Sequence, residues 1–420
     1  MKVLWIAQNG GSYKINKVKG TGGWIGALQE ELFKYDNNIE LGIVFPHPMD
    51  EDPITEGSVS YYPYRMSSGE KWYNKFLYYA TKKWEKDDEF CTTKILEVVA
   101  KFNPDIIHIW GIEFAHSAVI PKLNKPFVVH IQGLTALYVY TYLPSIFSVE
   151  DLKRCNSWFE RNLLHHGEYA EYQNYIRRAK RELAVSPAVK NWIGRTEWDY
   201  AASQLLSRDS RYFHGEEVMR NDFNGKKWKF HFNGTLHIQS NISNGWYKGI
   251  DVVLKTAEVL KHHNVEFEWH IYGIKRESKI VNYIIKKYKI IPEKVNVIFH
   301  GSVDGKTIVN SLLTSDVYVH PSYIENSSNA IAEAMYLGLP VIAQYVGGNP
   351  TMLKDGSGIL VAPNEPYSMA FNLMNLRNKE VAERYSKKAV EVAERRQDNR
   401  NTVTNLLKIY NTVIKDYDKT

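Results

Sequence analysis

Twenty residues in the second half of the chain read Pro321-Ser-Tyr-Ile-Glu-Asn-Ser-Ser-Asn-Ala-Ile-Ala-Glu-Ala-Met-Tyr-Leu-Gly-Leu-Pro340. The apolar run just before them, residues 316–320, predicts a short buried strand. Small polar residues at 326–328 suit the N-terminal cap of a helix, and the apolar residues that follow recur at helical spacing. A glycine and a proline mark the helix end. The pattern predicts a strand, a tight turn and a helix, with Glu325 in the turn and Glu333 in the helix.

This layout predicts a site for a diphosphate with a hydroxyl-rich group on either side. The first amides of a helix are unpaired and carry partial positive charge, so they can hold a phosphate. In this segment they belong to Asn326, Ser327, Ser328 and Asn329. Eight helical steps of about 1.5 Å put Glu325 and Glu333 at most roughly 12 Å apart, and each carboxylate can accept hydrogen bonds from adjacent hydroxyls. The alternative is that both glutamates are ordinary solvated charges.

Two flanking motifs add a family resemblance. Residues 341–350 read Val-Ile-Ala-Gln-Tyr-Val-Gly-Gly-Asn-Pro, and residues 355–361 read Asp-Gly-Ser-Gly-Ile-Leu-Val. Together with the segment around Glu325 and Glu333, they resemble the Glu-x7-Glu signature of retaining GT-B glycosyltransferases, especially glycosyltransferase family 4. The resemblance implies an α/β fold of two Rossmann-like, doubly wound parallel-sheet domains facing a cleft. It also implies a C-terminal helix that crosses back to the N-terminal domain.

The composition fits a packed protein of two domains. The chain has 420 residues, of which 44% are hydrophobic and 24% charged. No apolar run approaches the roughly 18 residues of a membrane span, and the start of the chain is too soon polar for a signal peptide, so we expect a cytoplasmic protein. Cys91 and Cys155 are the only cysteines, which excludes a disulfide framework and a cysteine zinc site. The net charge of +6 comes with no nucleic-acid-binding module, so no nucleic-acid partner is expected.

Alternating strand and helix patterns give the domain boundaries. The predicted domains are residues 1–222 together with the final helix 401–420, and residues 223–400. The resemblance implies that the first binds the acceptor and the second binds the donor. The resemblance also implies that residues 184–187 form the last strand of the first domain and that residues 189–194 form a helix after it. The patterns predict a strand at 227–233 that opens the second domain, and a loop at 238–246.

Further site residues come from the resemblance. Lys248 matches the position at which the family's ammonium group meets the donor diphosphate. Gly22 and Gly23 match a glycine pair that faces the diphosphate and the acceptor, although an ordinary loop turn would look the same. His130 matches a histidine at a strand end that contacts the donor sugar, the alternative being a structural histidine. The backbone near the nucleobase is matched by Gly301 and Val303.

One element of the family's phosphate clamp is missing. An arginine commonly stands a few residues before the position of Lys248, and this chain has Thr235 at the place that we align with it. Arg195, Arg276 or His237 can substitute for this arginine.

Residues 70–86 mix six aromatic side chains with five lysines. A basic aromatic helix of this kind can lie on a membrane surface, which would place the protein at the inner face of the cell membrane. A helix with one packed aromatic face and one solvated lysine face explains the pattern equally.

The resemblance thus implies a retaining, metal-independent glycosyltransferase of the hexosyltransferase type without a cofactor. It would move a sugar from a UDP- or GDP-sugar to a glycan or lipid-linked acceptor, in bacterial surface polysaccharide synthesis. Glu325 and His130 are the catalytic candidates. Two alternatives remain open, a non-catalytic protein that binds a nucleotide sugar and a nucleotide-sugar epimerase of the same fold.

Overall fold

The computed structural model describes residues 1–14, 23–36, 38–49, 51–65, 83–158 and 167–419. The chain divides into two compact units. Unit 1 comprises Met1–Val139, Asn156–Arg220 and Asp398–Thr420, and unit 2 comprises Tyr140–Cys155 and Asn221–Gln397. Among the described residues, no helix combines the length and the apolar character that crossing a bilayer requires. Most of the aromatic lysine-rich segment 70–86, together with Gly22, lies outside the described residues.

Unit 1 is a sheet with helices on both faces. The elements of its first half are β1 (Lys2–Ile6), α1 (Gly23–Tyr35), β2 (Glu40–His47), β3 (Ile54–Glu56), β4 (Val59–Arg65), α3 (Lys83–Phe102), β5 (Ile106–Trp110), η1 (Ala115–Lys122), β6 (Phe127–His130) and α4 (Thr135–Tyr138). The rest are α7 (Glu168–Val185), η2 (Ser186–Ala188), β7 (Asn191–Gly194), α8 (Glu197–Leu206), β8 (Arg211–His214) and α16 (Asn399–Tyr417). The strand order is β3-β4-β2-β1-β5-β6-β7-β8, and all neighbours are parallel except the edge pair β3 and β4.

Alternation of side chains along the strands creates two cores in unit 1. Val3 and Trp5 of β1 face a cluster that includes residues of α1 and α16. Leu4 and Ile6 of the same strand face the opposite cluster, which includes residues of α3 and η1. Because successive strand residues point to opposite faces and both faces are covered, these central strands read as continuous apolar runs.

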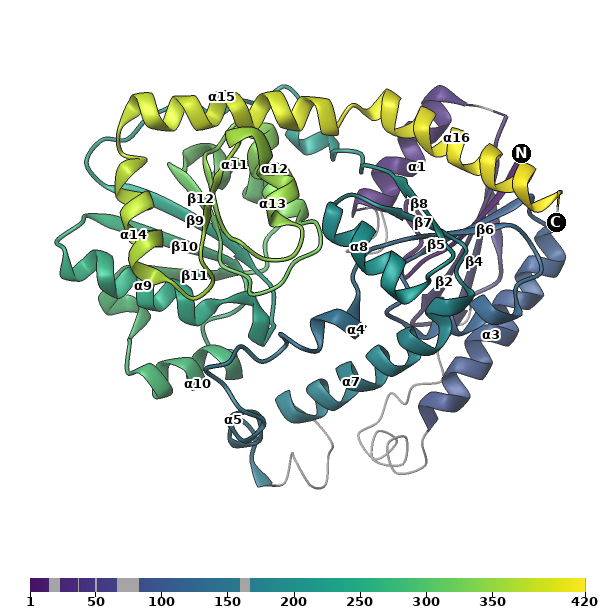
Figure 1. The fold of residues 1–420 in the computed structure, drawn as a ribbon, viewed down its shortest axis with the longest axis horizontal. Helices are drawn as coiled ribbons and strands as arrows, with labels where there is room; N and C mark the ends of the chain where they lie inside the picture. The colour runs from purple at the N-terminus through teal and green to yellow at the C-terminus, as the bar shows by residue number, and fades with distance from the viewer. Residues whose placement is uncertain (15–22, 37, 50, 66–82, 159–166, 420) are drawn as a thin grey trace. The chain divides into compact units, whose positions relative to one another are not determined.

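The last helix is an integral part of unit 1. In Figure 1, α16 lies beside α1, at the end of the chain that is coloured yellow. Its residue Tyr410 is fully buried. The Tyr410 hydroxyl accepts a hydrogen bond of 3.1 Å from Trp5 Nε1 and lies 2.6 Å from His108 Nδ1. The predicted return of the C-terminal helix to the N-terminal domain is confirmed.

Unit 2 is a second sheet, all of whose pairs are parallel. Its elements up to β12 are α5 (Val149–Arg154), η3 (Asn221–Phe223), β9 (Leu236–Ile242), η4 (Trp246–Lys248), α9 (Ile250–His262), β10 (Phe267–Gly273), α10 (Lys279–Tyr288), η5 (Pro292–Val295), β11 (Val297–Gly301), α11 (Gly305–Thr314) and β12 (Val317–His320). They are followed by α12 (Asn329–Leu337), β13 (Val341–Gln344), α13 (Asn349–Met352), η6 (Lys354–Gly356), β14 (Ile359–Val361), α14 (Pro366–Asn375) and α15 (Lys379–Arg396). The strand order is β11-β10-β9-β12-β13-β14. The predicted class, two doubly wound parallel-sheet units, is confirmed.

Residues 140–155 pack with unit 2, whereas the sequence-based division places them in the first domain. Phe147 meets Trp246 edge to face, with ring centroids 4.9 Å apart. Asp151 accepts hydrogen bonds from Tyr283 and, at 3.2 Å, from Lys287. The predicted boundary at 222 lies two residues beyond the end of this part of unit 1 at Arg220.

Four local predictions are wrong. Residues 184–187 end α7 and form η2, and the predicted helix at 189–194 contains the buried strand β7. The predicted strand at 227–233 has no regular structure, and unit 2 begins its sheet with β9, which covers much of the predicted loop at 238–246. In β9 every second side chain is polar, as in His237, Gln239 and Asn241, so an apolar run is absent.

We predict that the hydroxyl of Tyr410 stabilises unit 1. The variant Tyr410→Phe leaves the Trp5 N–H and His108 Nδ1 buried without this partner, which should lower the free energy of unfolding by about 1–3 kcal/mol. Urea unfolding followed by tryptophan fluorescence measures the loss. Tyr417→Phe is the matched control, because Tyr417 lies on the same helix, is 45% exposed, and should change stability by less than about 0.5 kcal/mol. Equal midpoints for the two variants would contradict the prediction.

Candidate functional site

The strand order of unit 2 defines where a ligand would bind. From β9 the chain proceeds outward through β10 to β11, and then returns to β12 on the other side of β9 before continuing to β13 and β14. The direction therefore reverses between β9 and β12. In open α/β sheets, ligands bind at such a switch point, beyond the carboxyl ends of the strands. The two segments at this position are residues 243–249, after β9, and residues 321–328, after β12.

Each of these two segments contributes one member of a buried ion pair. Lys248 Nζ donates to Glu325 Oε2 at 2.8 Å, and their side chains are only 16% and 11% exposed. His320, the last residue of β12, places Nε2 3.2 Å from the same carboxylate oxygen. The structure thus brings together the predicted residues Lys248 and Glu325, and it adds His320.

The charges of these side chains support one another. Burial by itself would raise the pKa of Glu325, but the charge of Lys248 and the hydrogen bond from His320 outweigh it and hold that pKa at about 2. Burial likewise opposes the charge of Lys248, yet Glu325 raises the pKa of that amine. Burial lowers the pKa of His320, so this imidazole is neutral near pH 7 and donates from Nε2. The site therefore holds one carboxylate, one ammonium group and one neutral imidazole.

Two glycines allow the loops to approach closely enough for this contact. Gly249 has φ of +77°, and a Cβ on it would lie 1.9 Å from the carbonyl oxygen of Pro321. Gly347 has φ of +49°, and a Cβ there would lie 1.9 Å from the carbonyl oxygen of Glu325. Gly348 N donates to that same carbonyl at 2.8 Å. Only glycine fits at both positions, so the motif residues Gly249 and Gly347 fix the backbones that carry Lys248 and Glu325.

The helix α12 begins at the same edge of the sheet. Ser328 is its N-cap, and its side chain accepts from Ile331 N at 3.4 Å. Asn326, Ser327 and Ser328 are buried. The positive end of the helix dipole therefore lies directly after Glu325 in the chain. Glu333 is in the second turn of α12 and is partly buried.

The remaining predicted residues of unit 2 lie along the same carboxyl edge. Gly301 ends β11 with φ of +67°, and Val303, 38% exposed, follows in the next loop. The order of the sheet puts β11 two strands from β9. Asn329 is the first residue of α12. The sequence-based proposal for these residues is thus compatible with the placement of their strands.

Thr235, the residue aligned with the missing arginine, lies at the edge of the unit 2 sheet opposite Lys248. Thr235 directly precedes β9, whereas Lys248 follows that strand, so Thr235 and Lys248 belong to opposite edges of the sheet. His237 lies near the same amino end. Arg276 follows β10 and pairs with Glu293 at 2.7 Å. Arg195 belongs to unit 1 and pairs with Glu217 at 2.8 Å.

His130 occupies the carboxyl end of β6 in unit 1. Its ring stacks on Trp110, with centroids 4.7 Å apart, and it is 3% exposed. Neither ring nitrogen has a hydrogen-bond partner among the described residues. Burial lowers the pKa of His130 to about 3, assisted by the charge of Arg195. A neutral buried imidazole with neither nitrogen hydrogen-bonded is unusual, because buried polar atoms are nearly always paired.

Unit 1 has its own switch point between β1 and β5. Glu113 lies in the loop after β5 and His116 in the helix η1 that follows, and His116 Nδ1 contacts Gln8, which follows β1. Burial raises the pKa of Glu113 to about 7. Gly23 opens α1 with φ of +49° and free space where a Cβ would lie, so the structure gives no packing reason for a glycine there.

Sequence reasoning missed His320 as a site residue. It stands five residues before Glu325, at the end of the predicted strand, and a polar residue that ends an apolar strand at a switch point is the signal that would have found it. Its other ring nitrogen, Nδ1, lies 3.4 Å from the hydroxyl of Tyr318, which fixes the orientation of the ring.

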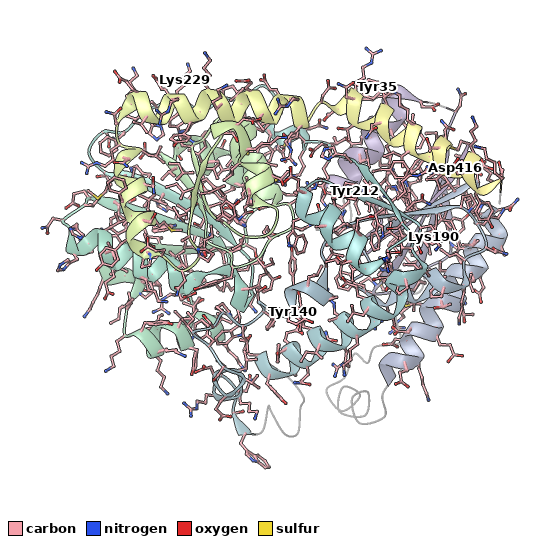
Figure 2. The ribbon with its side chains drawn as sticks, in the orientation of Figure 1. Tyr35, Tyr140, Lys190, Tyr212, Lys229 and Asp416 are labelled. Atoms are coloured by element: carbon pink, nitrogen blue, oxygen red, sulfur yellow. The ribbon has the colours of Figure 1, made fainter. Side chains whose placement is uncertain are left out.

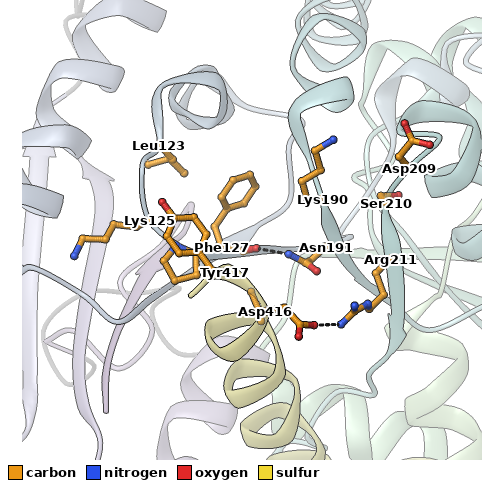
Figure 3. A pocket seen from close by; sticks show the side chains of 12 residues that line it. Leu123, Lys125, Phe127, Lys190, Asn191, Asp209, Ser210, Arg211, Asp416 and Tyr417 are labelled. Atoms are coloured by element: carbon orange, nitrogen blue, oxygen red, sulfur yellow. Dashed lines mark hydrogen bonds and ion pairs between the residues drawn. The ribbon is translucent and has the colours of Figure 1, made fainter. Parts of the chain in front are cut away.

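A pocket of about 540 Å³ lies elsewhere, in unit 1. Figure 3 shows that its lining comes from the starts of β6, β7 and β8 and from the last turn of α16, with Asn191 donating to the carbonyl of Phe127 and Arg211 paired with Asp416 at 2.6 Å. Asp416 is also labelled on α16 in Figure 2. Because these are amino ends of strands, the pocket is at the opposite edge of the unit 1 sheet from His130.

We predict that ionised Glu325 stabilises the fold in a pH-dependent way. Its folded pKa of about 2 lies below the usual 4.5, so its contribution is present above about pH 4.5 and is lost as the pH falls towards 2. The full contribution is about 3 kcal/mol. Urea unfolding of the wild type and of Glu325→Gln should show a stability difference that shrinks over this window.

The matched control for this experiment is Glu380→Gln, on the exposed start of α15. Its difference from the wild type should stay within about 0.5 kcal/mol at every pH. A difference between Glu325→Gln and the wild type that does not depend on pH would show that the Lys248 pair does not lower the pKa of Glu325.

Comparison with known proteins agrees with this geometry. Residues 243–392 match the family described as glycosyl transferases group 1. One curated relative is Protein CapJ of Staphylococcus aureus, which is 25% identical over 56% of this chain and 53% of CapJ. Another is the sulfoquinovosyl transferase SQD2 of Arabidopsis thaliana, which is 30% identical over 72% of this chain and 56% of SQD2. A third is the putative colanic acid biosynthesis glycosyltransferase WcaL of Salmonella typhimurium, which is 28% identical over 30% of this chain and 32% of WcaL. The chain spans about half the length of CapJ and of SQD2, and about a third of that of WcaL.

Solved structures share the fold over nearly the whole chain. Sucrose-phosphate synthase from Thermosynechococcus elongatus covers 99% of this chain and is itself covered completely, with a TM-score of 0.70 and 15% identity. Alr3699/HepE of Anabaena, solved in complex with UDP and glucose, covers 98% of this chain and is covered over 99% of its own, with a TM-score of 0.58 and 16% identity. The chain therefore has the two-unit fold of these proteins, and the segment that contains Lys248, Glu325 and Glu333 is similar to group 1 glycosyl transferases.

Proposed function

We propose that the chain is a glycosyltransferase that takes its sugar from a nucleoside-diphosphate sugar. The observation that carries this proposal is the buried pair of Lys248 and Glu325 at the switch point of unit 2, next to the start of α12. An ammonium group and a helix N-terminus both favour a diphosphate. A carboxylate held ionised beside them can accept two hydroxyl hydrogen bonds from a sugar. The group 1 match over 243–392 supports the same reading.

The predicted site residues of unit 2 have the following roles in this proposal. Lys248 and the amides near Ser327 bind the diphosphate, and Glu325 orients the sugar through its hydroxyls. Glu333, two turns into α12, binds the ribose. The backbone from Gly301 to Val303 lies against the base. Lys248 and Glu325 neutralise each other, and the donor would share both partners by placing its phosphate on Lys248 and its hydroxyls on Glu325.

The chemistry proposed is transfer with retention at the anomeric carbon. The bond from that carbon to the diphosphate oxygen breaks, a bond to the acceptor oxygen forms on the same face, and the acceptor proton leaves with the diphosphate product. Lys248 and the helix amides stabilise the negative charge that develops on the leaving group, as preorganised donors do. His320 holds the Glu325 carboxylate in place and acts as a positioning residue.

His130 supplies the polar atoms of unit 1. Its two open, buried ring nitrogens can donate one hydrogen bond and accept one from sugar hydroxyls. Because its pKa is lowered to about 3, it stays neutral and cannot act as a general acid near pH 7. We therefore assign it to sugar binding, and from the family resemblance we propose that Gly22 and Gly23 contact the diphosphate.

The reaction is proposed to need no metal ion and no cofactor. Asp-x-Asp, a spacing that can bind a metal–diphosphate complex, occurs at residues 50–52 and 416–418. Asp50 lies outside the described residues, and Asp416 closes α16 in an ion pair with Arg211.

The same proposal has three further parts: the acceptor is a glycan or a lipid-linked molecule, the chain belongs to family 4, and it acts in bacterial surface polysaccharide synthesis. They are supported by the Glu-x7-Glu spacing and by the similarity to WcaL, which is named for colanic acid biosynthesis. A cytoplasmic location, with peripheral contact at the inner face of the membrane through residues 70–86, is likewise proposed from the sequence.

A panel of nucleotides should identify the donor. Ligand at 100 times its dissociation constant stabilises the fold by about 2.7 kcal/mol, so a thermal-shift panel of UDP, GDP, ADP and their sugars should give one responding base. Lys248→Met should abolish that response while leaving the melting of unit 1 unchanged, and Lys279→Met, on the first turn of α10, is the control that should keep it. The absence of any response in the wild type would contradict donor binding.

Catalysis should depend on Glu325. With the responding donor, Glu325→Gln should lower kcat for donor hydrolysis or transfer at least about 100-fold, while Glu380→Gln leaves it unchanged. Anomeric configuration read by NMR should be retained in the product. Wild-type binding without turnover would favour the non-catalytic alternative, and a changed sugar configuration in free nucleotide sugar would favour the epimerase.

A further inference from the structure

A second group of chemically active side chains lies on the opposite edge of the unit 2 sheet. His237 is the second residue of β9, and Glu268 is the second residue of β10. The two are directly registered across the parallel pair. His270 follows Glu268 by two positions and so projects from the same face of β10. We call His237, Glu268 and His270 the amino-edge cluster.

The separations within the amino-edge cluster are longer than ordinary hydrogen bonds and suit a bridging ion. His237 Nδ1 lies 3.7 Å from Glu268 Oε2, and His270 Nε2 lies 3.4 Å from the same oxygen. Hydrogen bonds between such groups span about 2.7–3.2 Å. A tetrahedral zinc ion with bonds of about 2.0–2.1 Å would hold its ligand atoms roughly 3.3–3.5 Å apart. One ligand atom from each of the three residues lies within 4.8 Å of the others.

A neighbouring histidine sets the tautomer that a metal requires. His270 Nδ1 lies 2.9 Å from Nε2 of His300 on β11, and the two rings stack with centroids 5.2 Å apart. When His270 donates from Nδ1 to His300, its Nε2 lone pair points towards Glu268. Metal-binding histidines almost always donate their second nitrogen to such an outer partner. The stack continues from His300 to Tyr272, 4.5 Å away, which holds the outer partner in turn.

The site is accessible to an ion. The side chains of His237, Glu268 and His270 are 32%, 47% and 21% exposed, so an ion can enter and one coordination position can be filled by water. Two imidazoles and one carboxylate are a donor set of zinc and its first-row neighbours, whereas magnesium and calcium prefer oxygen atoms alone.

We propose that His237, Glu268 and His270 bind one divalent transition-metal ion of the zinc class. Two ligands two residues apart on one strand, with the third across from them on the next strand, form a preorganised three-ligand face. The ion links β9 to β10 at the amino edge of the sheet, and Lys248 and Glu325 lie at the carboxyl edge. The site is therefore structural for unit 2 and separate from the proposed transfer reaction.

Calorimetric titration tests the proposal. The full chain, produced without a histidine tag and stripped with EDTA, should bind one Zn²⁺ ion, and Co²⁺ in its place should give the visible absorption of a four-coordinate site. Glu268→Gln and His270→Ala should each weaken the affinity at least about tenfold, because loss even of an outer-shell partner costs that much. The double variant His262→Ala/His263→Ala removes two exposed imidazoles at the end of α9 and should bind as the wild type does.

Melting temperature provides a readout that does not depend on activity. Zn²⁺ should raise it for the wild type and for the His262/His263 control, and at the same Zn²⁺ concentration should raise it less for Glu268→Gln, whose fold is checked by circular dichroism. Failure of the wild type to bind Zn²⁺, equal affinity in Glu268→Gln and the wild type, or loss of binding in the His262/His263 control would each overturn the proposal. None of these results depends on whether the chain transfers sugar.

Discussion

The ion pair of Lys248 and Glu325 is the interaction on which the rest of unit 2 depends. Two charges taken out of water cost several kcal/mol each, and their attraction repays that cost only when the geometry is good. Here it is good because Gly249 lies against the carbonyl of Pro321 and Gly347 lies against the carbonyl of Glu325. A side chain at either glycine would push the loops apart and leave a buried charge alone. The charges thus constrain the loops, and the loops constrain the strands before them.

The same constraint explains the position of the site. A doubly wound sheet leaves a gap in its crossover connections only at the strand pair where the chain reverses direction. In unit 2 that pair is β9 and β12, and these strands deliver Lys248 and Glu325. The helix α12 then starts within the same edge, so the positive end of its dipole adds to the positive charge of Lys248. A site of mixed charge, suited to a ligand with both phosphates and hydroxyls, follows from the topology.

The site was more predictable from sequence than the surrounding strands. The segment 321–340 contains its own cap, stop and carboxylates, so the strand, turn and helix could be assigned from local chemistry, and the choice of Lys248 as a site residue followed from a family resemblance. Strand β7 could not be assigned, because its four residues, Asn191–Gly194, of which three are buried, show no periodicity that separates a strand from a helix. β9 was obscured for a different reason, since His237, Gln239 and Asn241 interrupt its apolar residues. The role of His320 and the amino-edge cluster depend on contacts between strands, which sequence spacing does not contain.

The return of α16 to unit 1 has a consequence for how the chain is made. The core of unit 1 contains Val403, Leu406 and Tyr410, yet these residues leave the ribosome after all of unit 2. Domains usually fold in the order of synthesis, but here the later unit can complete its core first. Until α16 is synthesised, the apolar face of unit 1 that this helix covers stays exposed. Chaperones should therefore bind mainly to the unit 1 part of the nascent chain.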